Sequence, residues 1–174
     1  DISVWLEFRR VLFRSHKVHG ESEFLPSILD ALSFDNKVLI EEAISARELE
    51  VGILEVNGIL ITSLPGEIKI DPKFEFYDFE SKYLDGATRV EIPPEITDEK
   101  KVTIQEFAKL AFRALGCRGF ARVDFFLDRD SGEIYLNEIN TIPGFTATSV
   151  YPKLMASVGI SYKEVITNLI NHAL

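Results

Sequence analysis

The chain has 174 residues, of which 46% are hydrophobic and 27% charged, so it can form one packed domain or two small lobes of an ordinary globular protein. Its formal net charge of −9 argues against a nucleic-acid surface as its main partner, and no apolar run approaches the roughly 18 residues of a membrane helix. The single cysteine, Cys117, excludes an internal disulfide and gives no zinc-binding constellation.

Residues 1–16 differ from the rest of the chain. Residues 1–20 contain four Lys or Arg and two Asp or Glu, a net charge of +2 against −11 for the remainder. The segment has three interpretations at this point. It is an amphipathic helix or strand that feeds a core, a binding element for an acidic partner, or sequence foreign to the domain that follows.

The chain then alternates a helix with short strands. Glu21–Ser33 has helical apolar spacing, and Lys37–Ile44 is predicted as a strand that ends in a polar hinge. The predicted apolar stripe of the helix consists of Phe24, Leu25, Ile28, Leu29 and Leu32.

A β-meander is predicted next. Its strands are Glu48–Val56, Ile59–Leu64 and Glu67–Ile70, and Asn57-Gly58 has the composition of a hairpin turn. Thr88–Ile92 is predicted as a further short strand, closed by two prolines.

Three helices are predicted in the second half. Asp98–Leu115 begins at a cap formed by Thr97 or Asp98 and ends at Gly116. Its predicted buried stripe is Ile104, Phe107, Ala108, Ala111 and Leu115. Ser149–Val158 and Ser161–Asn171 follow, broken at Gly159. Strands grouped apart from helices favour an α+β fold, with helices packed on an antiparallel sheet.

The most informative segment is a predicted hairpin, residues 120–128 and 135–145. Side chains alternate along a strand, so Arg122, Asp124 and Phe126 share one side. A turn near residues 129–132 would place Asp124 opposite Glu138, with Asn140 on the same side.

The chemistry of that face suggests a cation site. Two carboxylates about 5 Å apart repel each other unless a cation lies between them, and carboxylates with an amide oxygen are hard ligands that suit Mg²⁺. A solvated acidic face is the alternative. We favour the cation site because apolar residues fill the other positions and both strands are therefore expected to be buried. Those positions are Val123, Phe125, Leu127, Leu136 and Ile139.

Five ordered motifs within residues 17–174 together resemble the C-terminal part of the D-alanine–D-alanine ligases, a family of ATP-grasp enzymes. Any one of them alone would be weak evidence. They are Val38-Leu-Ile-Glu-Glu42, Arg47-Glu-Leu-Glu-Val51, Phe76-Tyr-Asp-Phe-Glu-Ser-Lys-Tyr83, Leu115-Gly-Cys-Arg-Gly-Phe-Ala-Arg-Val-Asp124 and Asn137-Glu-Ile-Asn-Thr-Ile-Pro-Gly-Phe145. The resemblance implies a catalytic ATP-grasp C-terminal domain over residues 65–174, and the remainder of the small ATP-grasp lobe with its hinge over residues 17–64.

In ligases of this kind, ATP phosphorylates the carboxylate of a first D-alanine, and the amine of a second attacks the acyl phosphate. The resulting dipeptide serves peptidoglycan synthesis. The resemblance therefore implies ATP, D-alanine and two Mg²⁺ ions, with Mn²⁺ as a substitute. It also implies a cytoplasmic enzyme, homodimeric in the full-length family, with neither nucleic acid nor membrane as a partner.

The resemblance assigns the phosphate chemistry to the hairpin and to one loop. Asp124, Glu138 and Asn140 match the Mg²⁺ ligands that hold the triphosphate. Arg122 matches the residue that steadies the transferring phosphate and the tetrahedral intermediate. Lys82 matches a phosphate-binding lysine, although without the resemblance it would be interpreted as a solvated loop residue.

The resemblance also assigns the adenosine. Phe76 and Phe126 match residues that pack on adenine, and Glu48 matches a ribose ligand. The hinge strand would pair its backbone with the adenine edge. The implied nucleotide residues are Glu41, Glu42, Ile44, Glu48, Phe76, Lys82, Phe126 and Glu138.

The acceptor pocket is implied by the last motif. Gly144 and Ser149 match positions where a backbone N–H and a hydroxyl receive a carboxylate, and Val150 is an apolar wall beside them. Tyr83 matches a loop tyrosine that favours an amine as acceptor, so it favours D-alanine over D-lactate.

Full-length members of the family also carry an N-terminal domain and a glycine-rich phosphate loop. This chain has neither the domain nor the loop before residue 17, and residues 1–15 match nothing in the family pattern. We therefore interpret residues 1–16 as a foreign segment. Phosphoryl transfer depends on positioning, and we expect little or no ligase activity from this chain alone. The alternatives are another carboxylate–amine ligase, such as a D-alanine–D-lactate or D-alanine–D-serine ligase, or a non-catalytic ATP-binding fragment.

Overall fold

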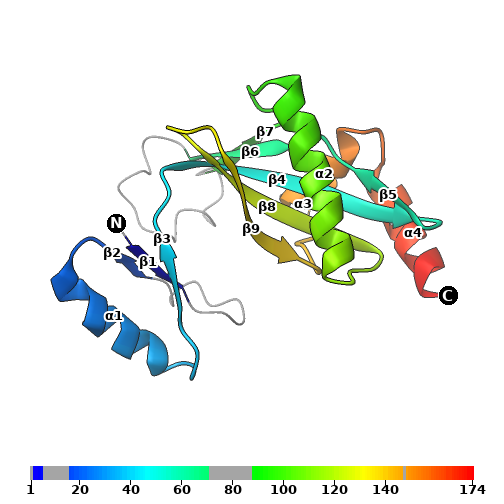
Figure 1. Cartoon of the computed structure of the whole chain (residues 1–174). Helices are drawn as coiled ribbons and strands as arrows, with labels where there is room; N and C mark the ends of the chain where they lie inside the picture. The colour runs from blue at the N-terminus through cyan, green and yellow to red at the C-terminus, as the bar shows by residue number, and fades with distance from the viewer. Residues whose placement is uncertain (1, 6–15, 71–87, 147) are drawn as a thin grey trace.

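The computed structural model describes residues 2–5, 16–70, 88–146 and 148–174. Within them, a three-stranded sheet with one helix forms a small lobe, and a six-stranded sheet with three helices forms a large lobe (Figure 1). Every strand pair in both sheets is antiparallel, which confirms the predicted α+β class. No described helix is long and apolar enough to cross a bilayer.

The small lobe contains β1 (Ile2–Trp5), β2 (His16–Val18), α1 (Glu21–Leu32) and β3 (Leu39–Glu42). β1 pairs with β2 on one side and with β3 on the other, so the first segment of the chain is the central strand of this sheet. The chain then runs from β3 into the large sheet (Figure 1).

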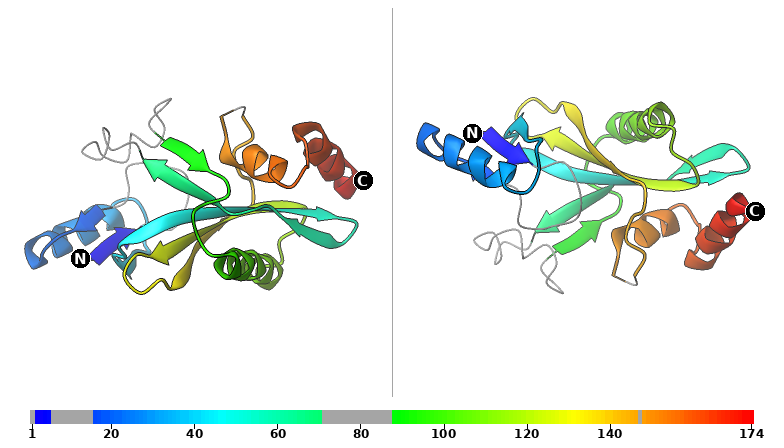
Figure 2. Two further views of the ribbon diagram at one scale, coloured as in Figure 1. Left: turned by 90° about the horizontal axis from the view of Figure 1, so that it is seen from above. Right: turned by 90° about the horizontal axis from the view of Figure 1, so that it is seen from below.

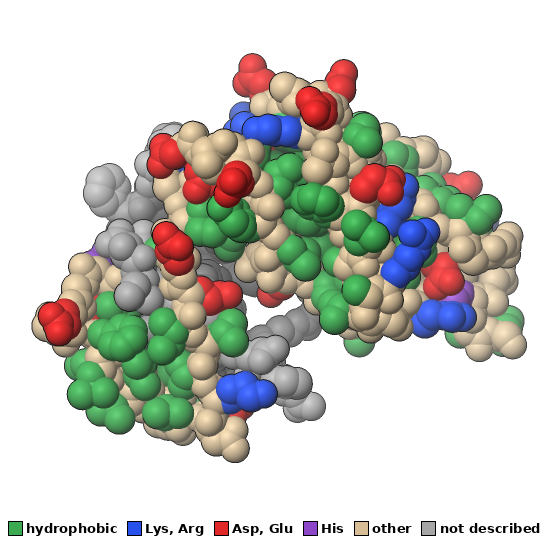
Figure 3. Space-filling view, viewed as in Figure 1, with side chains coloured by type: hydrophobic (Ala, Val, Ile, Leu, Met, Phe, Trp, Pro, Cys, Tyr) green, Lys and Arg blue, Asp and Glu red, His purple; other side chains and the backbone are tan. Residues whose placement is uncertain are grey.

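Part of the core of the small lobe is described. Val18 and Ala31 are buried, with Phe24 and Val38 packed against them. The predicted helix is present as α1, and three leucines of its apolar stripe are 45% to 61% exposed: Leu25, Leu29 and Leu32. Figure 3 shows hydrophobic side chains gathered on the outer surface of this lobe. The sheet beside α1 has only three short strands, so it covers only part of the apolar surface of the helix.

The large sheet has the order β7-β6-β4-β8-β9, with β5 paired to β4. Its long central strands are β4 (Ala46–Val56) and β8 (Phe120–Asp128), which pair from Ala46↔Asp128 to Leu54↔Phe120. The other strands are β5 (Ile59–Thr62), β6 (Gly66–Ile70), β7 (Thr88–Glu91) and β9 (Ile134–Asn140).

The predicted meander is only partly correct. The β4–β5 hairpin turns at Asn57 and Gly58, whose φ angles of 51° and 79° explain the turn composition. β6 does not continue from β5, because its described partners are β4 and β7. β8 occupies one edge of β4, so β5 and β6 follow each other along the opposite edge.

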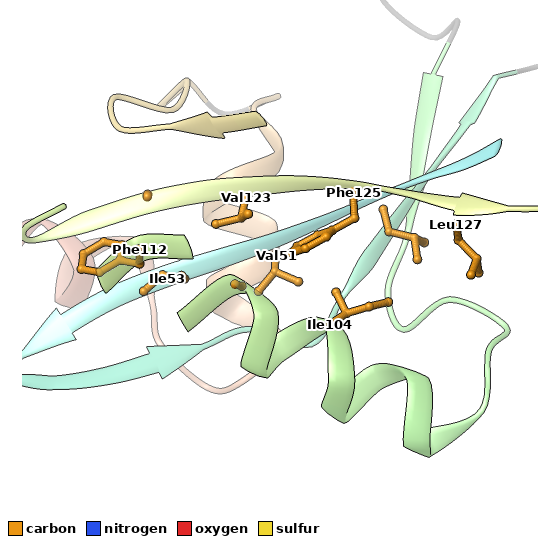
Figure 4. Close-up of a cluster of buried hydrophobic side chains, with 10 residues drawn as sticks. Val51, Ile53, Ile104, Phe112, Val123, Phe125 and Leu127 are labelled. Atoms are coloured by element: carbon orange, nitrogen blue, oxygen red, sulfur yellow. The ribbon is translucent and has the colours of Figure 1, made fainter. Parts of the chain in front are cut away.

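Helix α2 (Asp98–Ala114) covers one face of the large sheet (Figure 2). Thr97 Oγ1 accepts the Lys100 N–H at its start, as expected for the cap. Figure 4 shows the resulting core, in which each fully buried large side chain contributes roughly 1.5–3 kcal/mol. Its buried residues are Leu49, Val51, Ile53, Ile104, Ala108, Phe112, Ala121, Val123, Phe125 and Leu127.

Helices α3 (Val150–Ala156) and α4 (Tyr162–Ala173) pack on the opposite face (Figure 2). Tyr151 lies against Gly52, and its hydroxyl donates to the Ile53 carbonyl at 2.8 Å. The two helices bury Leu54 at one end of β4. They leave the other end of this face to polar side chains.

The hairpin prediction is correct in register but wrong in burial for its second strand. Asp124 pairs with Glu138, as predicted. β9 is the last strand of the sheet, and Leu136 is 52% exposed, whereas the same face of β8 is buried. A bulge after Asp124 leaves Asn137 outside the pairing.

Candidate functional site

A row of polar side chains occupies the open end of the large sheet, on the face opposite α2. Its members alternate with the buried core along β4 and β8. The β4–β8 pairing sets Glu50 opposite Asp124, and the β8–β9 pairing sets Asp124 opposite Glu138 and Arg122 opposite Asn140. The β8–β9 hairpin and β4, which is distant from it in sequence, therefore bring three carboxylates, one amide and one guanidinium together.

Arg122 is the centre of this charged row. Its Nε donates to Asp124 Oδ1 at 2.7 Å and its Nη2 donates to Asp124 Oδ2 at 2.6 Å, a bidentate pair. Glu50 Oε2 lies 3.4 Å from Nε, and Glu138 Oε1 lies 3.8 Å from Nη2. Among the described residues, Arg122 thus lies within 4 Å of three carboxylates.

Three of these four side chains are largely buried. The side chains of Arg122, Asp124 and Glu50 are 18%, 13% and 12% exposed, whereas that of Glu138 is 61% exposed. Burial alone would lower the pKa of the Arg122 guanidinium, but the hydrogen bonds to Asp124 and the charges of all three carboxylates raise it above its usual value. Arg122 is therefore a permanent cation.

The predicted metal ligands are close together in the sheet, but they are not arranged as a closed metal site. Among the described residues, no three His, Cys, Asp or Glu side chains are placed to hold a metal ion. Both oxygens of Asp124 accept hydrogen bonds from Arg122, and Asn140 Oδ1 accepts from the Ile142 N–H at 3.2 Å. The donor set of two carboxylates and an amide oxygen nevertheless fits a hard divalent cation.

The predicted acceptor residues lie together after β9. A Cβ added at Gly144 would lie 2.9 Å from Ser149 Oγ, so a side chain at this position would displace the Ser149 hydroxyl. Ser149 Oγ accepts the Thr146 N–H at 2.9 Å, which turns the hydroxyl toward the loop at the start of α3. Val150, the predicted apolar wall, is half-buried at the first position of α3.

The predicted hinge joins the two lobes. Glu41 and Glu42 belong to β3 and pair with Ser3 and Ile2, and Ile44 is half-buried in the connection to β4. Both glutamate side chains are exposed.

The predicted ribose and adenine positions share the face of the charged row. Glu48 of β4 pairs directly with Phe126 of β8, and Phe126 pairs with Tyr135 of β9. The hydrogen bond from Tyr135 to Glu133, together with the charges of Asp128 and Glu42, raises the pKa of the Tyr135 phenol.

Three predicted site residues, Phe76, Lys82 and Tyr83, lie outside the described residues. Their roles remain predictions.

The sequence reasoning missed Glu50. The motif Arg47-Glu-Leu-Glu-Val51 contained the signal, because Glu48 and Glu50 are two residues apart in a strand and share one face.

A separate cavity of about 290 Å³ lies at the far end of β4. It contains none of the predicted site residues. Its lining residues are Glu55, Gly58, Leu60, Phe112, Arg113, Gly116, Cys117 and Arg118. The candidate site is therefore the open face of the sheet and not this cavity.

Comparison with known proteins gives a consistent result at the level of sequence. Residues 15–171 match the family model described as D-ala D-ala ligase C-terminus. The D-alanine–D-alanine ligase of Chlorobium phaeobacteroides (strain BS1) is 46% identical over 158 residues, which cover 91% of this chain and 43% of that protein. The ligase of Oceanobacillus iheyensis is 48% identical over 160 residues, with the same two coverages. The chain thus spans less than half the length of the curated relatives it matches.

Solved structures agree with the fold. The D-alanine–D-alanine ligase of Coxiella burnetii superposes with a TM-score of 0.83 at 30% identity, over 99% of this chain and 44% of the other. The VanG D-Ala:D-Ser ligase of Enterococcus faecalis superposes with a TM-score of 0.84 at 34% identity, over 99% of this chain and 49% of the other. The fold is that of about half of an ATP-grasp ligase.

Proposed function

Because the chain belongs to the D-alanine–D-alanine ligase C-terminal family, we propose that it supplies the ATP-binding and acceptor-binding part of a ligase that joins two D-alanine molecules through an acyl phosphate. The observation that carries the proposal is the charged row of β4, β8 and β9 beside the loop that holds Gly144 and Ser149. The row suits a metal-bound triphosphate, and the loop suits the carboxylate of a small amino acid.

The phosphate end of the site is assigned to the hairpin. Asp124, Glu138 and Asn140 would hold Mg²⁺, which would neutralise triphosphate charge and orient the phosphates. Arg122, fixed as a cation, balances charge that develops on the transferring phosphoryl group and then on the tetrahedral intermediate. Its bidentate pairing with Asp124 supports this role, because the fork is already oriented along the row.

The acceptor end is assigned to the loop before α3. With no side chain at Gly144, the backbone can lie close to Ser149, so a backbone N–H and a hydroxyl are available to one carboxylate. Glu48 and Phe126, adjacent on the same face, are the proposed ribose and adenine contacts. Lys82 is the proposed phosphate lysine and Tyr83 the residue that favours an amine acceptor.

Calorimetric titration of the chain with ATP tests the nucleotide site. We expect ATP to bind in the presence of Mg²⁺, and Asp124→Asn or Glu138→Gln to weaken binding about tenfold or more, equivalent to about 1.4 kcal/mol. Glu106→Gln is the matched control, because it removes a carboxylate of α2 that pairs with Lys109 on the surface. Equal affinities for the site variants and the control would refute the assignment.

Release of ADP in the presence of ATP, Mg²⁺ and D-alanine tests the reaction. Turnover that depends on D-alanine and is abolished by Asp124→Asn would establish a working ligase in this chain. Binding without turnover is the result we expect, because the chain matches less than half of each relative. Failure of both would show that the chain lacks the proposed site.

The identity of the acceptor is a second question, raised by the similarity to a D-Ala:D-Ser ligase. We expect D-alanine to be preferred over D-serine and D-lactate. Competition of the three compounds for the ATP-loaded protein, measured by calorimetry, distinguishes these acceptors.

A further inference from the structure

Glu50 is a buried carboxylate at the charged row that the proposed function does not yet use. It is 9% exposed as a residue, it lies on the central strand β4, and it pairs directly with Asp124 of β8. A carboxylate in such a position is costly unless a cation is close to it. Arg122 provides such a cation, with its Nε 3.4 Å from Glu50 Oε2.

The same N–H of Arg122 is near two carboxylates. Arg122 Nε donates to Asp124 Oδ1 at 2.7 Å, and Glu50 Oε2 is only 3.4 Å from that nitrogen. A movement of less than an ångström along this line would bring Glu50 within an ordinary hydrogen-bond distance. Glu50 and Asp124 are thus alternative acceptors for one donor.

The proposed cation site makes this alternative necessary. Both oxygens of Asp124 accept hydrogen bonds from Arg122, so Asp124 cannot offer them fully to a cation while that bidentate pair is intact. Loss of the pair without replacement would leave a buried guanidinium short of a partner, which is unfavourable. A second carboxylate beside Nε removes this penalty.

We propose that Glu50 is the positioning residue for Arg122: it takes over the Nε–H when Asp124 turns to a cation, and so holds the guanidinium on the sheet face. The inference rests on the proposed function for the identity of the cation. The exchange of one hydrogen-bond acceptor for another does not depend on it. Glu50 acts through Arg122 and need not touch the nucleotide.

The first test needs no metal. We would follow the exchange of the Arg122 Nε–H with solvent by NMR, after assigning its resonance with Arg122→Gln. Asp124→Ala removes the first acceptor, and we expect the N–H to remain slowly exchanging because Glu50 accepts it. Asp124→Ala combined with Glu50→Leu, which removes the second acceptor, should speed exchange about tenfold relative to Asp124→Ala alone. Equal exchange in the single and double variants would overturn the proposal.

The second test adds Mg²⁺ and ATP and uses a double-mutant cycle. Glu50→Gln should weaken Mg²⁺-dependent ATP binding about tenfold when Arg122 is present, and less than about threefold in the Arg122→Gln background, where Asp124 has no guanidinium to release. Equal losses in both backgrounds would mean that Glu50 contributes only charge, and would refute the exchange of acceptors. Glu106→Gln controls for the change in net charge.

The two tests separate the proposals. If the chain binds no Mg²⁺ and ATP, the proposed function fails, while the metal-free exchange still decides whether Glu50 holds Arg122. If ATP binds and the exchange rates do not respond to Glu50, only the role of Glu50 fails. Circular dichroism of each variant establishes that the sheet is intact. Glu50→Asp keeps the charge but shortens the side chain, so it should restore only part of the protection.

Discussion

At the scale of single residues, the charged row depends on Arg122 as the common partner of three carboxylates. Arg122→Met should lower the free energy of unfolding by about 3 kcal/mol, because it removes the guanidinium that pairs with the largely buried Asp124 carboxylate. Urea unfolding in metal-free buffer measures the loss. Arg118→Met is the matched control: Arg118 is 77% exposed and 3.8 Å from Glu55, so its loss should cost less than about 1 kcal/mol. Similar losses for the two variants would contradict the central role of Arg122.

Gly144 offers a second prediction at this scale. Gly144→Ala should push Ser149 Oγ away from the Thr146 N–H, at a cost of about 1 kcal/mol for the lost hydrogen bond. Thermal unfolding measures the destabilisation. Gly20→Ala is the control, because a Cβ at Gly20 would meet nothing within 4 Å. Ser149→Ala in the Gly144→Ala background should remove the clash without restoring the proposed acceptor contact.

A second buried carboxylate, Glu67, gives a pH prediction. Burial alone would raise the pKa of Glu67, but hydrogen bonds from Arg47 and Lys69 and their charges hold it below its usual value of 4.5. A carboxyl whose pKa falls on folding stabilises the protein above the unfolded pKa, and this contribution is lost as the pH falls through the folded pKa. Unfolding free energy should therefore decline below about pH 4.5, less steeply in Glu67→Gln, with the two proteins converging in acid. Parallel pH profiles would contradict this.

The sequence predicted the hairpin half of the site well, because alternation and a short turn fix which side chains oppose each other. The pairing of Asp124 with Glu138 could be predicted from the two strands of the hairpin alone. Glu50 could not be located in the same way, since its pairing with Asp124 joins strands that are far apart in sequence. The sequence also gave no sign that Arg122 would bind both oxygens of Asp124.

At the scale of elements, helix ends were predicted more reliably than helix faces. Thr97 and Ser161 cap α2 and α4 through local hydrogen bonds, and Gly116 has the positive φ of 63° that suits a helix end. The buried face of α2 was partly wrong. Phe107 and Leu115 are 43% and 63% exposed, and Phe112 is buried instead. Apolar residues occur around much of this helix, so the sheet decides which of them are buried.

The position of α3 depends on two glycines of the sheet. A Cβ at Gly66 of β6 would lie 2.8 Å from a methyl group of Leu154, and one at Gly52 would lie 3.0 Å from the sulfur of Met155. Gly66→Ala should therefore lower unfolding free energy by about 1–3 kcal/mol, through overpacking between sheet and helix. Chemical denaturation measures it, with Gly20→Ala as the control. An unchanged midpoint would show that α3 can move away at no cost, and that Ser149 at its start is not rigidly placed.

At the scale of the whole molecule, burial differs between α1 and the central strands of the large sheet. Helix α1 buries one of its residues, Ala31, whereas β4 and β8 supply most of the buried core under α2. Few buried apolar contacts mean a low free energy of local opening. We expect amides of α1 to exchange hydrogen faster than those of β4 and β8, and to open at lower denaturant. Exchange followed by mass spectrometry measures this, and a single common opening for all elements would contradict it.

The pairing of β4 with β8 also constrains how the molecule reaches its native state. Ala46 pairs with Asp128 and Leu54 with Phe120, so the chain must close a long loop, which contains β5, β6, β7 and α2, before its central ladder can form. Non-local pairing of this kind is slow, and on a ribosome it waits until β8 has emerged. Glu50 and Arg122 meet only at that late step. The charged row is therefore assembled at the end of folding, and a nascent chain that stops before Phe120 holds an unpaired edge of β4.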